Sequence, residues 1–249
     1  RMGIKGQQGT YIPNLGYSRD DVYKMMHLLK PGYSFRGSYE YNNITFIIAQ
    51  KIIEKLSGKS WEDNLKDVIL DPLGMYNTSA NGEPFAASPY AAVPNDYGWR
   101  DSIYHSPLLG EEQALHWLTV VGPAGSVNST VPDMLKYVRF HLDKGKAGGK
   151  EIITKRGMDY LHRGQTITSQ DSARTTLYAH CWFVEQNSKY RLWFHTGTTW
   201  GFTTLVAFVP EMNLGMVFLV NSDAPANLRY SLMRRLIDMY RGEEVLRDY

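Results

Sequence analysis

Hydrophobic positions recur at helical spacing through much of the chain. The pattern predicts amphipathic helices over residues 18–29, 44–56, 60–70 and 130–142. Ser18, Ser60 and Thr130 precede three of these helices, and each has an aspartate three residues later, an arrangement typical of a capping box.

Two further features belong to this part of the chain. Ile44, Ile48, Ile52 and Leu56 form one apolar stripe along the second predicted helix. Residues 81–113 are rich in Pro, Ala, Tyr and Gly and show no period, which predicts a long ordered loop. Long loops of this kind often carry function, and the aromatic residues of this one either line a cleft or anchor the loop: Tyr90, Tyr97, Trp99 and Tyr104.

The last third of the chain changes to the pattern of β-strands. Residues 177–185 and 190–195 predict one hairpin, and residues 203–209 and 215–220 predict a second. The strands of the second hairpin are almost continuously apolar, which indicates a sheet covered on both faces. A closing helix provides one cover through Leu228, Leu232, Met233, Leu236, Ile237 and Tyr240. The other cover must come from helices in the middle of the chain or from residues outside this sequence.

These elements predict an α/β protein of the α+β type. An antiparallel sheet is flanked by helices and joined to a mostly helical lobe. We place the helical lobe at residues 1–170, and the antiparallel strands with their closing helix at residues 171–249. The chain has 249 residues, of which 43% are apolar, enough for one large core or two closely packed lobes.

Composition excludes several functional classes. The 27 basic and 25 acidic residues nearly balance, so the chain lacks the basic stripe of a nucleic-acid binder, and a small molecule or short peptide is the better partner. No apolar run reaches the roughly 18 residues that a membrane span requires. Neither histidine nor cysteine pairs have metal-ligand spacing, so we expect no metal and no other cofactor.

Two motifs bear candidate chemistry. Tyr41-Asn42-Asn43 lies just before a predicted helix, where a phenol can face a cleft and act in proton transfer, and where an amide offers both a donor and an acceptor. His195-Thr196-Gly197-Thr198 lies at the end of a predicted strand, where backbone N–H groups can bind a peptide or an oxyanion. Taken singly, the first motif is more often a tyrosine that packs in the interior, and the second is more often a glycine-rich strand connection with a histidine in the core.

Together and in this order, the motifs resemble the second and third signature motifs of class C β-lactamases and penicillin-binding-protein-like serine hydrolases. The resemblance extends from about Ser18 to Tyr240. It includes Leu56-Ser57-Gly58-Lys59-Ser60-Trp61-Glu62, Asp71-Pro72-Leu73-Gly74-Met75, Pro123-Ala124-Gly125-Ser126 and the segment from Gly201-Phe202 through Pro210 to Asn221.

The resemblance implies a role for each motif residue. Tyr41 matches the general base or acid, and Asn43 matches the residue that binds the amide of the substrate. His195, Thr196 and Gly197 match the third motif, in which many members have lysine first. The backbone N–H of Thr198 matches one half of the oxyanion hole. Relatives of this kind are often periplasmic or otherwise extracytoplasmic in bacteria.

The family's nucleophile is the serine of a Ser-x-x-Lys motif. None of the 16 serines in this sequence has a lysine three residues later. We therefore expect the chain to be the C-terminal portion of a serine hydrolase, inactive by itself, with the missing N-terminal segment as its partner. The alternatives are a ligand-binding member of the fold without catalysis, and a fragment without a role of its own.

Histidine in place of lysine generates the first prediction. Lysine is cationic near pH 7, whereas histidine, with a pKa near 6.5, is mostly neutral and attracts a substrate carboxylate less well. In the complete protein, we expect kcat/KM for a neutral ester to exceed kcat/KM for a penicillin. A higher kcat/KM for the penicillin, measured under the same conditions, would contradict this expectation.

Overall fold

The computed structural model describes residues 2–80, 82–97, 103–105, 112–199, 201–223 and 227–243. Its helices are α1 (Arg19–Met25), α2 (Phe46–Ser57), α3 (Trp61–Leu65), α4 (Asp71–Leu73), α5 (Gly82–Ala86), α6 (Glu112–Val120), α7 (Gly122–Gly125), α8 (Val131–Leu142), α9 (Lys155–His162) and α10 (Leu228–Tyr240). Short 3-10 turns cover Ile12–Leu15, Met26–Leu28 and Pro210–Met212, and a π-helical turn covers Lys66–Leu70.

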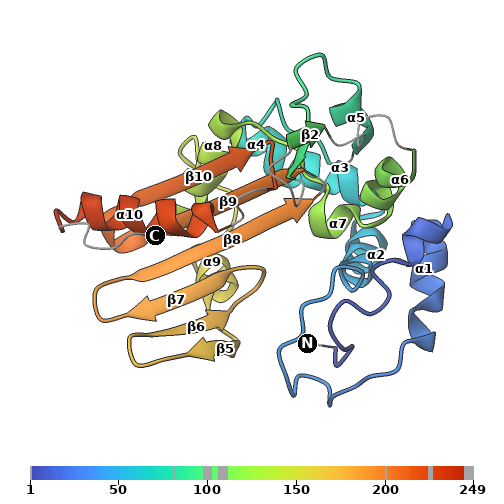
Figure 1. Cartoon of the computed structure of the whole chain (residues 1–249), viewed down its shortest axis with the longest axis horizontal. Helices are drawn as coiled ribbons and strands as arrows, with labels where there is room; N and C mark the ends of the chain where they lie inside the picture. The colour runs from blue at the N-terminus through green and yellow to red at the C-terminus, as the bar shows by residue number, and fades with distance from the viewer. Residues whose placement is uncertain are drawn as a thin grey trace.

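The strands form one large sheet and two small ones. The six-stranded sheet has the order β10-β9-β8-β7-β6-β5, and all its neighbours are antiparallel (Figure 1). Its strands are β5 (Thr166–Gln170), β6 (Arg174–Tyr178), β7 (Phe183–Asn187), β8 (Arg191–Thr199), β9 (Phe202–Val209) and β10 (Leu214–Val220). The small sheets pair β1 (Asn95–Tyr97) with β2 (Ile103–His105), and β3 (Lys146–Ala147) with β4 (Lys150–Glu151).

Helices cover both faces of the large sheet. Met233 of α10 belongs to a buried cluster with Leu192 of β8, whereas Val138 of α8 belongs to another cluster with Trp193, the next residue of β8. Because successive side chains of a strand point to opposite faces, α10 and α8 lie on opposite sides of the sheet. The predicted fold class is therefore confirmed, and the second cover comes from the middle of the chain.

The predicted apolar stripes were partly wrong. Ile44 is buried, but Leu56 is 83% exposed, and α2 instead buries Ile47. On α10 the predicted inward residues include Leu232, which is 40% exposed, because the helix turns Arg229, Met233 and Ile237 toward the sheet. Both helices carry apolar residues on more than one side, so periodicity alone could not decide which side faces the core.

The predicted strand over residues 177–185 is in fact two strand ends joined by a turn. Cys181 adopts a left-handed conformation with φ of 63° in this turn, and the chain reverses between β6 and β7. The predicted loop over residues 81–113 contains α5, β1, β2 and the start of α6. Neither β5 nor α9 was predicted from the sequence. The division at residue 170 stays a prediction, although β5, which ends there, already belongs to the sheet.

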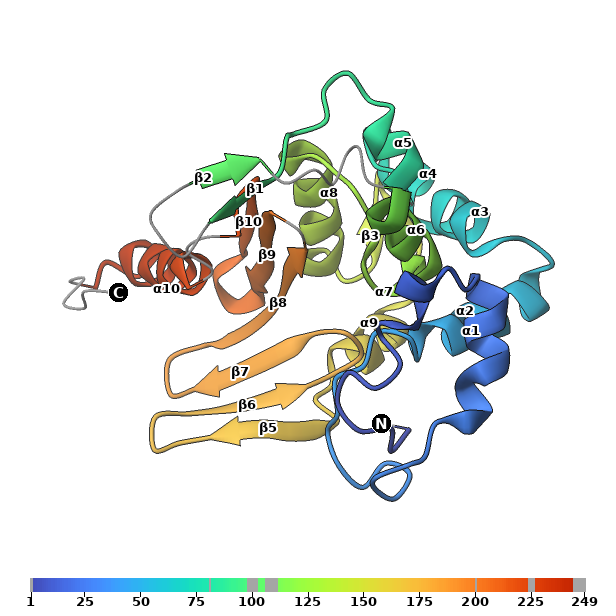
Figure 2. The same cartoon turned by 45° about the vertical axis from the view of Figure 1, so that its right-hand side comes forward.

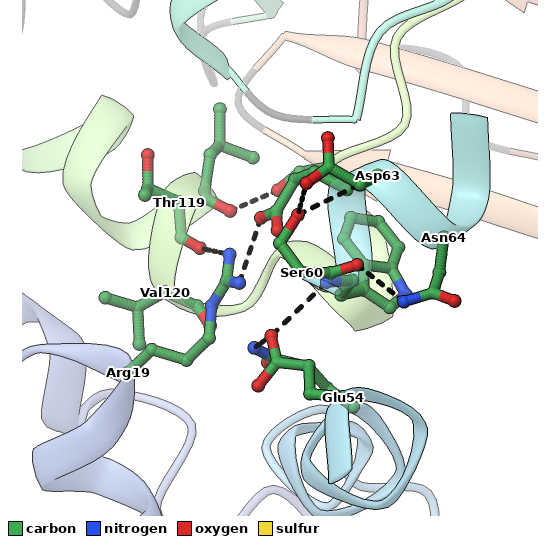
Figure 3. Close-up of polar contacts among 12 residues, drawn as sticks. Arg19, Glu54, Ser60, Asp63, Asn64, Thr119 and Val120 are labelled. Atoms are coloured by element: carbon green, nitrogen blue, oxygen red, sulfur yellow. Dashed lines mark hydrogen bonds and ion pairs between the residues drawn. The ribbon is translucent and has the colours of Figure 1, made fainter. Parts of the chain in front are cut away.

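A cluster of polar contacts joins the helices of the helical lobe (Figure 3). Arg19 of α1 donates to the carbonyl oxygens of Thr119 and Val120 at the end of α6, and its Nη1 lies 2.9 Å from Oε1 of Glu62 in α3. The last carbonyls of a helix have no partner within the helix, so a cation there supplies both hydrogen bonds and favourable charge. Arg19 thereby fixes three helices around one guanidinium.

An ion pair fastens α10 to the sheet. Glu185 of β7 is buried, and its two carboxylate oxygens lie 3.1 and 2.9 Å from the guanidinium nitrogens of Arg234. Arg174 of β6 lies 3.4 Å from the same carboxylate. A buried carboxylate requires such partners, since an unpaired charge in the interior is costly.

None of the described helices has the length and apolar character needed to cross a membrane.

Two neutral histidines meet in the core between α8 and α9. His141 Nδ1 lies 2.8 Å from His162 Nε2, and the rings of Trp182 and Phe208 contact His141. Burial lowers the pKa of His141 to about 3 and that of His162 to about 4. Both imidazoles are therefore uncharged at neutral pH, and one donates its N–H to the other.

This pair predicts acid sensitivity. The unfolded chain protonates these histidines near pH 6.5, whereas the folded chain does not, so their full contribution is present above pH 6.5 and is lost as pH falls toward 4. Between pH 7 and pH 5 we expect a loss on the order of 2 kcal/mol of unfolding free energy per histidine. Urea unfolding across this range measures it.

The matched control uses a histidine outside the core. His141→Gln should flatten the dependence of unfolding free energy on pH, and His27→Gln, at an exposed position, is the control substitution. Equal slopes in the wild type and His141→Gln would show that the pair does not control acid stability.

Candidate active site

Tyr41 is held at the entrance to α2 by its neighbour Asn42. The Asn42 amide is buried, and its Nδ2 donates to the carbonyl oxygens of Gly6 and Gln8, each at 2.9 Å. Its Oδ1 accepts from the Thr45 N–H at 3.2 Å, at the start of the helix. The amide therefore uses donors and acceptor together to join the first loop of the chain to the junction that carries Tyr41.

The third motif occupies the far end of β8, beyond its pairing with β7. The ladder between β7 and β8 ends at Phe183 opposite Phe194, while β8 continues to Thr199 paired with β9 alone. Within the described residues, the stretch from His195 to Thr199 thus has one edge without a partner strand. An unpaired edge presents backbone N–H and C=O groups to whatever lies beside it.

Alternation along the strand indicates which groups face that edge. His195 Nδ1 lies 2.8 Å from the carbonyl oxygen of Thr196, and no β7 residue pairs there. Backbone groups of residues two apart point the same way, so the Thr198 N–H faces the same edge as the Thr196 carbonyl. Thr198 is exposed, and its role as an oxyanion donor stays a prediction.

Folding brings Tyr41 next to His195 although 153 residues separate them in the sequence. Their ring centroids are 6.3 Å apart, and both side chains are half-buried. Figure 2 shows the segment before α2 beside the turn between β6 and β7, near the end of β8. Tyr39 contributes to the same contact, with its ring 5.2 Å from that of Tyr178. The lobe and the sheet therefore meet through aromatic rings.

Neither member of the pair is charged at neutral pH. Burial raises the pKa of Tyr41, with a smaller contribution from the Cys181 thiol. Burial also lowers the pKa of His195, and the nearby Arg229 guanidinium lowers it further, outweighing the opposite effect of the hydrogen bond to Thr196. The site therefore presents a phenol and a neutral imidazole, and His195 does not supply the positive charge that a lysine would.

A buried cation lies behind the motif strand. Arg229 of α10 donates through Nη1 to the Gly197 carbonyl at 2.6 Å and to Thr198 Oγ1 at 2.9 Å. Gly197 itself is packed closely, because an added Cβ would lie 2.5 Å from Thr204 Oγ1 on the neighbouring strand. Arg229 and the absence of a side chain at position 197 together fix the strand end.

The other residues that the sequence predicted for the site form fewer contacts. Asn43 is half-buried, and within the described residues its side chain forms no hydrogen bond. Thr196 Oγ1 lies 3.4 Å from the Tyr230 hydroxyl. In the predicted loop, Tyr90 is 93% exposed, while Trp99 and the side chains of Tyr97 and Tyr104 lie outside the described residues.

Comparison with known proteins decides the family. A sequence model of the beta-lactamase family matches residues 1–237. The chain belongs to the beta-lactamase family. Among the described residues, no group of three or more His, Cys, Asp or Glu could hold a metal ion.

Two curated proteins are similar to this chain over most of its length. An unguisins hydrolase from Aspergillus campestris is 25% identical over 227 residues, covering 88% of this chain and 41% of the relative. Penicillin-binding protein 4 from Amycolatopsis lactamdurans is 25% identical over 209 residues, covering 81% of this chain and 52% of the relative. The chain thus spans about half the length of these curated relatives.

A solved structure shares the fold. The octameric penicillin-binding protein homologue from Pyrococcus abyssi matches with a TM-score of 0.78 at 19% sequence identity, over 97% of this chain and 54% of that one. At this level of identity the match concerns the fold, and it agrees with the arrangement of sheet and helices in this beta-lactamase family chain.

The sequence analysis of this beta-lactamase family chain missed several residues around the site. Asn42, Tyr178 and Arg229 hold Tyr41, His195 and the motif strand respectively. Asn42 lies within the motif Tyr41-Asn42-Asn43, but the sequence gave no sign of its hydrogen bonds to the distant residues 6 and 8. Arg229 and Tyr178 gave none, since their partners are 17 or more residues away in the sequence.

The two adjacent asparagines make a matched pair for mutation. Asn42→Ala removes three partly buried hydrogen bonds and leaves two carbonyls without donors, so we expect a loss of about 2–4 kcal/mol of unfolding free energy. Asn43→Ala should cost less than about 1 kcal/mol. Denaturant unfolding of both variants measures this, and equal losses would show that Asn42 does not hold the junction.

Proposed function

We propose that the protein is a serine hydrolase that cleaves amide or ester bonds of a small molecule or short peptide through an acyl-enzyme. The observation that carries this proposal is the contact between Tyr41 and His195, which joins two family motifs at an open strand edge. A proton-transfer group beside unpaired backbone donors is the arrangement that acyl transfer requires.

In this proposal the chain supplies the C-terminal part of the site. The nucleophile is the serine of a Ser-x-x-Lys motif that lies outside these 249 residues, since no serine of the printed sequence has that context. Among the described residues β10 is an edge strand of the sheet, and this edge and the exposed residues of α2 offer surfaces for the remainder of the parent protein. The family's curated relatives are about twice as long, which supports the same arrangement.

The proposed chemistry assigns each group a step. The serine oxygen attacks the carbonyl carbon, and the oxyanion accepts hydrogen bonds from the Thr198 N–H and from the N–H of the serine itself. Tyr41 is a phenol rather than a phenolate, so it donates its proton to the leaving amine or alcohol and takes the serine proton in return. Water then releases the acyl group by the reverse transfer. Asn43 hydrogen-bonds the amide of the substrate.

The decisive substitution removes only the phenol oxygen. In the complete protein, Tyr41→Phe should lower kcat by about 10²- to 10⁴-fold with little change in KM, because the proton transfer is lost while the ring remains. Tyr76→Phe, at an exposed position far along the helical lobe, is the matched control and should keep wild-type kcat. Wild-type turnover by Tyr41→Phe would remove Tyr41 from the mechanism.

A second candidate is a ligand-binding member of the family without catalysis, which the missing Ser-x-x-Lys motif favours. Treatment with a fluorophosphonate followed by intact-mass measurement separates the two. We expect no adduct on the 249-residue chain and one adduct on the complete protein. If the complete protein also remains unlabelled and its coding sequence begins near Met2, the ligand-binding function stands instead.

A further inference from the structure

Tyr178 lies at the end of β6 and contacts the imidazole of His195. The Tyr178 hydroxyl is 3.1 Å from His195 Nε2, and His195 Nδ1 is 2.8 Å from the Thr196 carbonyl oxygen. A carbonyl oxygen only accepts, so Nδ1 must carry the proton. In a neutral imidazole the other nitrogen is then an acceptor, and the Tyr178 O–H donates to it.

The surroundings favour this protonation state from several sides. The ring of Tyr178 lies 4.8 Å from the ring of Phe183 and 5.2 Å from the ring of Tyr39. Burial strongly raises the pKa of Tyr178, so the hydroxyl keeps its proton. The charged and titratable groups that face His195 and Tyr178 are Arg229 from α10, Tyr39 and Tyr41 from the segment before α2, and Cys181 from the β6–β7 turn. Of these, Arg229 is the one cation, and it opposes a second positive charge.

We propose that Tyr178 is a positioning residue that locks His195 as a neutral imidazole protonated on Nδ1, and thereby sets the site's preference for substrates that carry no carboxylate beside β8. The inference rests on the proposed function for its substrate class, but the lock itself is a property of this chain. Both ring nitrogens are engaged within the protein, so His195 offers a bound acyl group neither a charge nor a free N–H.

The lock is tested without any activity measurement. Long-range ¹H–¹⁵N NMR spectra of the chain, with the His195 signal assigned from His195→Gln, report which nitrogen is protonated and the pH at which the ring titrates. We expect the proton on Nδ1 and a titration midpoint below the ordinary histidine value near 6.5. Tyr178→Phe keeps the ring but removes the donor, so the Nε2 shift should change and the titration midpoint should rise by about half to one pH unit.

Tyr39→Phe is the matched control. It removes a hydroxyl from the same aromatic group, but Tyr39 contacts Tyr178 through its ring, so the His195 signal should stay as in the wild type. Unfolding midpoints of both variants check that they fold. Protonation of His195 on Nε2 in the wild type, or identical His195 signals and midpoints in the wild type and Tyr178→Phe, would overturn the lock.

The substrate preference is tested in the complete protein with a matched pair of esters, one neutral and one bearing a carboxylate. The ratio of kcat/KM for the neutral ester to kcat/KM for the ester with the carboxylate should stay constant from pH 8 to pH 6 in the wild type. In Tyr178→Phe this ratio should fall severalfold toward pH 6, because His195 gains a positive charge that attracts the carboxylate. An unchanged ratio in Tyr178→Phe would overturn the specificity role, whereas a complete protein without turnover and with the NMR result intact would count against the proposed function alone.

Discussion

The structure depends on the burial of β8 and β9 between α8 and α10. Phe208 and Ala207 are both fully buried, and they point to opposite faces of the sheet because they are neighbours on one strand. Each face therefore needs a helix, and the chain supplies one from its middle and one from its end. Beneath this double cover β8 is paired on both edges as far as Phe194, from where the strand projects past β7 toward the helical lobe.

The projecting end of β8 is the part of the sheet that the candidate site uses. A strand covered on both faces but free on one edge presents accessible backbone donors, and β8 gains this free edge because its pairing with β7 stops at Phe183, the first residue of β7. The helical lobe brings Tyr41 to this edge through the segment before α2, and Asn42 ties that segment to the first loop. The position of Tyr41 is thus fixed by one buried amide rather than by a regular element.

The charge at the site comes from one buried cation among the described groups that face it. The one cation against the motif strand, among the described groups that face it, is Arg229, and its Nη1 is committed to the strand by hydrogen bonds to Gly197 and Thr198. His195 is neutral because burial and this neighbouring charge act in the same direction. In the proposed mechanism the proton transfers therefore run between neutral groups, which places the demand on geometry instead of on a stabilised phenolate.

The sequence by itself determined the local features and the family. Helix starts at Ser18, Ser60 and Thr130 follow from caps within three residues, and the apolar strands follow from side-chain burial on both faces. Tertiary structure alone decided which stripe of α2 and α10 turns inward, where the chain reverses at Cys181, and which residues hold the site. Those outcomes depend on contacts between residues far apart in the sequence, such as Tyr178 with His195 and Arg229 with Gly197, and a one-dimensional pattern carries no record of such contacts.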